Sequence, residues 1–267
     1  MTGVAAPARR ATRWQPTGNT AETPRDYTGF MSPPTASRPA GVNRVLVAHG
    51  TRKPGGVAMI AALADRVGAL LGQPVHVAFV DVVGPGPAEV LRADPSPAVV
   101  VPAFVARGYH VRRDLPAQLL ASGHPQITLT PALGPGAALV GLLAAQLRAA
   151  GCRRGDAVVL AVAGSADPLA RADVTRLAER LAATAGSAVA LGCVATGSPG
   201  VEQVVARARR RGAHRVIAVS GLLADGLFQD RLRGCGADVV TDPLGAQPML
   251  ARAVADQFLR ASHAVAA

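Results

Sequence analysis

One pattern of strand-like and helix-like segments occurs twice along the chain, and this duplication constrains the fold more than any other feature. Short β-branched runs alternate with longer Ala- and Leu-rich segments whose apolar residues recur at helical spacing. After residue 155 the series begins again: AVVLAVAGSAD matches RVLVAHGTR, and HRVIAVSGLLADG matches PAVVVPAFVARG. Strict alternation of strand and helix predicts parallel sheets with right-handed crossovers. We therefore expect an α/β protein of two homologous parallel-sheet domains related by internal duplication.

The expected domain boundaries follow from where this pattern starts and restarts. Residues 1–40 contain several arginines, prolines and threonines without an apolar core, which is unlike a secretory signal. We expect them to form a disordered tail, with Met31 as an alternative start of translation. Residues 41–152 are predicted to form the N-terminal half and residues 153–267 the C-terminal half.

Composition excludes several classes of function. The formal charge is +11, but Lys53 is the only lysine, and an excess of arginine together with alanine and glycine can reflect coding bias. The sequence contains no zinc-finger or helix-turn-helix spacing, so we expect no nucleic-acid partner. Three widely spaced cysteines without a C-x-x-C motif indicate free thiols and a cytoplasmic protein. We expect no membrane span, because no uninterrupted apolar run reaches 18 residues outside amphipathic segments.

Three polar residues at strand ends of the first half have apolar counterparts in the second half. Aligning the halves sets His49 opposite Ala163, Asp81 opposite Ala195 and His110 opposite Phe228. Ligands of parallel α/β sheets bind beyond the carboxyl ends of the strands, so these three side chains are expected to converge. Two imidazoles and a carboxylate suit a divalent cation such as Fe²⁺, Co²⁺ or Ni²⁺, and they equally suit proton transfer. The alternative is structural: a histidine after a strand can be a turn residue, and an aspartate there can cap the turn.

Basic residues flank both histidines. Their positive charge would surround the predicted site and suits a substrate that carries several carboxylates. These candidate substrate contacts are Arg52, Lys53, Arg107, Arg112 and Arg113. The basic run 207–211 lies at a predicted helix end of the second half and is interpreted as a solvated face.

The segments VLVAHGTR, VAFVD, VVVPAFVARGYHVRRDLP and PALGPGAALVGLLAAQL resemble the sirohydrochlorin chelatases of the CbiX/SirB type, in their long two-domain form. The resemblance covers about residues 43–265. It implies a chelatase fold, with His49 and His110 as the metal-handling pair and one active site between the halves. The family's usual acidic partner is a glutamate, and this chain has Asp81 in its place.

The resemblance also implies an activity. The chain would insert Co²⁺ or Fe²⁺, as a substrate, into sirohydrochlorin for cobalamin or sirohaem biosynthesis, without an organic cofactor. A monomer would suffice, because two fused halves form a pseudo-dimer. Two alternatives stay open: a noncatalytic carrier of tetrapyrrole or metal on the same fold, and a histidine phosphatase-like hydrolase. The hydrolase requires an arginine directly before His49-Gly50, and this chain has Ala48 there.

Overall fold

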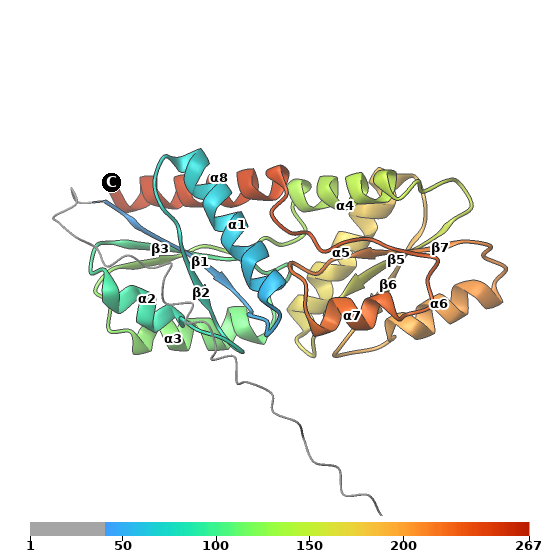
Figure 1. Cartoon of the computed structure of the whole chain (residues 1–267), viewed down its shortest axis with the longest axis horizontal. Coiled ribbons are helices and arrows are strands. Elements are labelled where there is room, and N and C mark those ends of the chain that lie inside the picture. Colours follow the sequence, from blue (N-terminus) through green and yellow to red (C-terminus); the bar gives the residue numbers. More distant parts are fainter. Residues whose placement is uncertain (1–40, 267) are drawn as a thin grey trace, which may run out of the picture. The chain divides into compact units, whose positions relative to one another are not determined.

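The computed structural model describes residues 41–266, so the predicted tail and the alternative start at Met31 lie outside the described residues (Figure 1). The first half contains, in order, β1 (Asn43–Ala48), α1 (Pro54–Leu71), β2 (His76–Phe79), α2 (Pro87–Ala93), β3 (Ala98–Pro102), the π-helix η2 (His110–Asp114), α3 (Leu115–Ala121), β4 (Ile127–Leu129) and α4 (Ala137–Ala149). The second half contains β5 (Ala157–Val162), α5 (Pro168–Ala185), β6 (Val189–Cys193), α6 (Val201–Arg210), β7 (Val216–Ser220), α7 (Leu227–Arg233), β8 (Val239–Val240) and α8 (Pro248–Ala266).

Each half builds one four-stranded sheet in which every neighbouring pair is parallel. The strand order is β2-β1-β3-β4 in the first sheet and β6-β5-β7-β8 in the second. The central strands β1, β3, β5 and β7 are mostly apolar and almost completely buried, as expected for strands covered on both faces. The predicted fold class, two homologous parallel α/β repeats, is therefore confirmed.

Local sequence sets matching helix ends in the two halves. The helices α1 and α5 both have 18 residues, and each begins with a proline, whose fixed φ suits the first helical turn. Both end at a glycine in the left-handed conformation, Gly72 and Gly186, each with a φ of 63°. The same start and stop residues thus produce the same helix in both repeats.

The last helix of each half packs on the other half. α8 packs against α1 and β3 of the first half, whereas α4 packs against α5 and β7 of the second half. Figure 1 shows α8 beside α1 and α4 above β5 and β7. This exchange builds one core from both halves, including Leu46, Val101, Leu160, Ile217 and Phe258. The boundary at 152/153 stays a prediction, and residues from both sides of it belong to one shared core.

Each sheet also has an outer layer of its own. On the first sheet, α2 packs on β1 and β2, and a separate apolar cluster includes Val47, Leu91 and Leu115. On the second, α6 packs on β5, β6 and β7, with Val159 and Val204 in the corresponding cluster. The carboxyl ends of the strands, between these layers, position the loops of the candidate site.

The helix α1 is long and apolar enough to cross a membrane by length and composition. In this structure it packs against β2 and α8, and Ile60, Leu63 and Val67 are buried in the shared core. This packing accounts for its apolar character. The absence of a membrane span in this chain stays a prediction. The three cysteines are free, as predicted.

Candidate metal centre

Three neighbouring strands place the predicted ligands at one edge of the first sheet. His49 follows β1, Asp81 follows β2, and His110 begins η2 after β3. One ligand atom from each of the three residues lies within 4.8 Å of the others. The two imidazole rings meet edge to face, with centroids 4.6 Å apart and an interplanar angle of 88°. The predicted convergence of these side chains is therefore present in the structure.

Both histidines contact the protein through Nδ1. His49 Nδ1 lies 3.2 Å from the carbonyl oxygen of Gly50, and His110 Nδ1 lies 2.8 Å from Asp114 Oδ2. A carbonyl or carboxylate oxygen only accepts a hydrogen bond, so each Nδ1 must carry the proton. The lone pair of each neutral ring is then on Nε2, where it can bind a cation.

Asp114 and Gln118 belong to the site but were not among its predicted residues. Gln118 Nε2 donates to Asp114 Oδ1 at 2.9 Å and to the carbonyl oxygen of Val80 at 3.0 Å. Burial raises the pKa of the Asp114 carboxyl, but hydrogen bonds from Gln118 and His110 and the nearby imidazoles outweigh it. That pKa lies below its ordinary value. The signal in the sequence was the spacing of four between His110 and Asp114, which places both side chains on one helical face.

The backbone beside the site is tightly constrained. Gly50 has a φ of 103°, and an added Cβ would clash with the backbone carbonyl of Asp81. The amide of Asp81 donates to the carbonyl oxygen of His49 at 3.1 Å, which joins the two loops. Val82, a β-branched residue, has a φ of 73° and is the one non-glycine residue with positive φ in the described chain. Such strain often lies at functional sites, and here it adjoins a candidate ligand.

The second half lacks the corresponding polar groups, as the alignment predicted. Among the described residues, His49, Asp81 and His110 form the only such group of potential metal ligands. The structure thus has one candidate centre, and it belongs to the first repeat.

The predicted substrate contacts stay a prediction, and three of the five basic side chains are paired with acids of the second half. Arg107 pairs with Asp173, Arg112 with Asp167 at 2.8 Å, and Lys53 with Asp230 at 2.5 Å and Asp225 at 3.9 Å. The physical reason is that the positive loops of the first half face aspartates of the second half. Within residues 41–266, no ion pair involves Arg52 or Arg113, and both are exposed.

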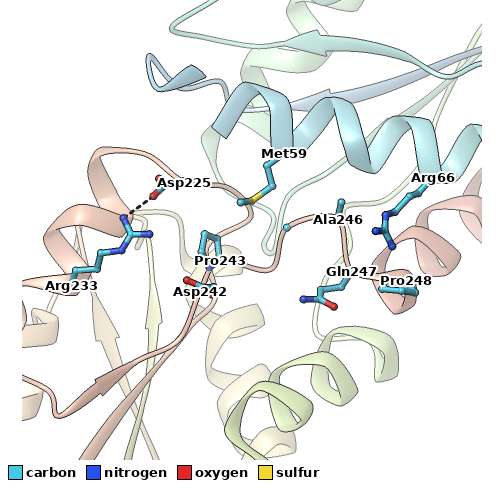
Figure 2. Close-up of a pocket in the computed structure, with 10 residues that line it drawn as sticks. Met59, Arg66, Asp225, Arg233, Asp242, Pro243, Ala246, Gln247 and Pro248 are labelled. Carbon is cyan, nitrogen blue, oxygen red and sulfur yellow. Dashed lines mark hydrogen bonds and ion pairs between the residues drawn. The ribbon is translucent and has the colours of Figure 1, made fainter. Parts of the chain in front are cut away.

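A pocket of about 520 Å³ lies beside this ion-pair network, between α1 and the connection from β8 to α8 (Figure 2). Met59 extends from α1 toward Pro243, while Asp225 and Arg233 are joined by an ion pair at its edge. The lining consists of Met59, Arg66, Asp225, Arg233, Asp242, Pro243, Gly245, Ala246, Gln247 and Pro248. None of the three candidate ligands is among these residues, so the pocket is distinct from the histidine cluster.

The fold and this cluster together define a two-repeat α/β protein with one candidate metal centre. The CbiX family model matches residues 43–150 and again residues 157–261. The chain therefore belongs to the CbiX family, and the double match coincides with its two repeats. The search of curated proteins found no relative.

Solved structures share this fold. SirB from Bacillus subtilis with Fe³⁺ has 20% identity and a TM-score of 0.71, over 85% of this chain and 98% of that one. The sirohydrochlorin chelatase SirB from Bacillus subtilis subspecies spizizenii, in complex with cobalt, has 19% identity and a TM-score of 0.67, over 84% and 96%. CbiX, the terminal enzyme of sirohaem biosynthesis in denitrifying bacteria, has 23% identity and a TM-score of 0.61, over 82% and 99%.

Proposed function

We propose that this chain is a sirohydrochlorin chelatase that inserts a divalent metal ion, Co²⁺ or Fe²⁺, into the tetrapyrrole. The observation that carries this proposal is the convergence of His49, Asp81 and His110 in a member of the CbiX family. Support also comes from the solved SirB structures of the same fold, which are described with Fe³⁺ and with cobalt. The reaction would supply cobalamin or sirohaem biosynthesis.

The residues present suit the chemistry of insertion. A tetrapyrrole must lose two pyrrole protons, and the ion must exchange its water for ring nitrogens. Two imidazoles that present Nε2 can hold the ion and accept a proton. Two histidines and one carboxylate leave coordination positions open, an arrangement associated with Fe²⁺. An incoming macrocycle can use those positions, whereas a closed set of four protein ligands would retain the ion.

Asp81 supplies the negative charge of the site. It is exposed, and its Oδ1 accepts a hydrogen bond from the amide of Val82 at 2.7 Å. This contact fixes the carboxylate beside the imidazoles while its other oxygen stays available. We assign Asp81 to offset the charge of the cation and to pass protons outward.

Substrate binding is assigned first to Arg52 and Arg113, which are exposed and are the two of the five predicted basic contacts that form no ion pair within residues 41–266. Guanidinium groups form paired hydrogen bonds with carboxylates, which sirohydrochlorin carries around its ring. Lys53 and Arg112 can join only after their aspartate partners are displaced. No organic cofactor is required in this scheme, and free cysteines support a cytoplasmic location.

The test is a turnover assay that follows the visible spectrum of sirohydrochlorin with added Co²⁺ or Fe²⁺. We expect many turnovers per chain, and we expect His49→Ala and His110→Ala to abolish them without loss of secondary structure. The exposed His214 provides the matched control, His214→Ala, which should retain activity. A spectral change that stops at one equivalent of protein would instead identify a carrier. Relative rates with the two ions identify the preferred metal.

A further inference from the structure

We infer that Asp114, held in place by Gln118, is a positioning residue that fixes which nitrogen of His110 faces the metal. The inference rests on the proposed function, since it concerns the same site. It adds two residues to that site and assigns each a separate task. Asp114 keeps the proton of His110 on Nδ1, and Gln118 keeps the Asp114 carboxylate oriented.

The hydrogen bonds form one continuous chain. The carbonyl oxygen of Val80, directly after β2, accepts a hydrogen bond from Gln118 Nε2 at 3.0 Å. The same nitrogen donates to Asp114 Oδ1 at 2.9 Å, and Asp114 Oδ2 lies 2.8 Å from His110 Nδ1. Every group in this chain has a defined role as donor or acceptor, because a backbone carbonyl can only accept. The donor and acceptor of each hydrogen bond are therefore fixed, from the Val80 carbonyl to the imidazole of His110.

The backbone places these groups in register. His110 and Asp114 are the first and last residues of η2, and Gln118 lies one further turn along, in α3. A π-turn inside a helical segment is rare and is frequent at functional sites. In the second half Phe228 replaces His110, and Leu232, four residues later, is fully buried. The chain of hydrogen bonds therefore exists only in the half that carries the histidines.

The chain predicts an unusual response to Asp114→Asn. The asparagine side chain has one oxygen, which accepts, and one NH₂ group, which donates. Gln118 would still present its NH₂ group at this position, because the carbonyl oxygen of Val80 requires a donor. The oxygen of the introduced asparagine would thus turn toward Gln118 and its NH₂ toward His110. Nδ1 would then have to accept, which moves the ring proton to Nε2 and removes the lone pair that binds metal. Partners of this kind typically contribute about 10–100-fold to metal affinity.

Removing Gln118 releases this constraint. In the double variant Asp114→Asn/Gln118→Leu, the asparagine oxygen is free to face His110 and to accept from Nδ1. We therefore expect the second substitution to restore most of the Co²⁺ affinity that the first one removes. Gln118→Leu alone leaves the Asp114 carboxylate in contact with His110, and it should change affinity by less than about threefold.

The experiment measures two quantities on the full chain. Long-range ¹H–¹⁵N NMR of histidine-labelled protein without metal, at a pH where the rings are neutral, reports the proton position on His110. The His110 signal is identified by its loss in His110→Ala. Titration with Co²⁺ alone, followed by its visible absorption, reports affinity. Asp65→Asn, on the exposed side of α1, is the control for loss of one carboxylate.

The expected result is Nδ1–H in the wild type, Nε2–H in Asp114→Asn, and recovery of Nδ1–H and Co²⁺ affinity in the double variant. An unchanged tautomer in Asp114→Asn would overturn the inference, and so would a double variant no better than the single one. If the tautomer follows this pattern but the wild type shows no turnover with sirohydrochlorin, the proposed function fails and the positioning role stands.

Discussion

Arg107 of the first half donates from its guanidinium to both carboxylate oxygens of Asp173 in the second half, at 2.9 and 2.6 Å. The amide of Arg107 adds a third hydrogen bond at 3.0 Å. The Asp173 side chain is only 2% exposed, whereas that of Arg107 is 44% exposed. This pair ties the loop before His110 to α5 of the other repeat.

Arg107→Ala leaves a buried carboxylate without its cation. We expect the free energy of unfolding to fall, because the buried Asp173 carboxylate loses its cation and the hydrogen bonds from the guanidinium. Urea denaturation followed by circular dichroism measures this loss. Arg171→Ala, on the exposed face of α5, is the control. The double variant Arg107→Leu/Asp173→Met should be more stable than Arg107→Ala, because it leaves no buried charge. Methionine suits this position, since Met59 is the sixth residue of α1 and Asp173 is the sixth residue of the matching helix α5.

The same pair makes stability depend on pH. The hydrogen bond from Arg107 holds the pKa of the Asp173 carboxyl below its ordinary value, although burial acts in the opposite direction. The contribution is therefore present above the unfolded pKa of about 3.9 and is lost as pH falls through the lower folded pKa. The stability difference between wild type and Arg107→Ala should be constant near neutral pH and shrink below about pH 4. Denaturation curves in which this difference grows on acidification would contradict the assignment.

Asp167 pairs with Arg112, one of the proposed substrate contacts, so we expect it to compete with the substrate for that guanidinium. Asp167 also caps α5, through Oδ1 and the amide of Leu169 at 2.8 Å, and asparagine can retain that cap. Asp167→Asn should release Arg112 and lower the KM for sirohydrochlorin by about two- to fivefold, as expected for an exposed ion pair. The effect should weaken at high salt, which screens exposed charges. Arg112→Ala in the same background should cancel the gain, and a raised KM in Asp167→Asn alone would refute the competition.

Gly50 allows two loops of the site to approach each other. Gly50→Ala combines a left-handed backbone with a clash against the Asp81 carbonyl. Gly50→Ala should lower the free energy of unfolding by more than Gly72→Ala does. Gly72 also has a positive φ, 63°, but an added Cβ there would meet open space. Gly72→Ala should therefore cost only the backbone strain, about 1–2 kcal/mol. Because the clash separates His49 from Asp81, Co²⁺ affinity should fall only in Gly50→Ala. Equal behaviour of the two variants in unfolding and in Co²⁺ titration would show that the close approach is unimportant.

The sequence predicted the repeat architecture and the convergence of His49, Asp81 and His110 for one physical reason. Parallel strands bring their carboxyl ends to the same edge, so residues that follow neighbouring strands meet regardless of the loops between them. Comparing the two halves then distinguished the residues that both repeats share, which the fold needs, from the polar side chains that occur in the first repeat alone.

The partners of the charged and helical segments could not be predicted in this way. The positive charge of Arg107 indicates an acidic partner, but it does not show whether that acid belongs to a substrate or to α5. An apolar face on α4 or α8 fits either sheet, because both sheets present Val and Leu. Gln118 is tied to Val80, a contact 38 positions apart in the chain that no local spacing indicates.

The crossing of α4 and α8 also limits how such a chain can be divided. A fragment ending near residue 150 would keep α4 but lose α8, the helix that lies on its own sheet, and would leave β3 bare on one side. In a dimer of that fragment, the last helix of each copy could cover the sheet of the other copy. A protein with one repeat per chain would therefore need to dimerise to bury both of its sheets.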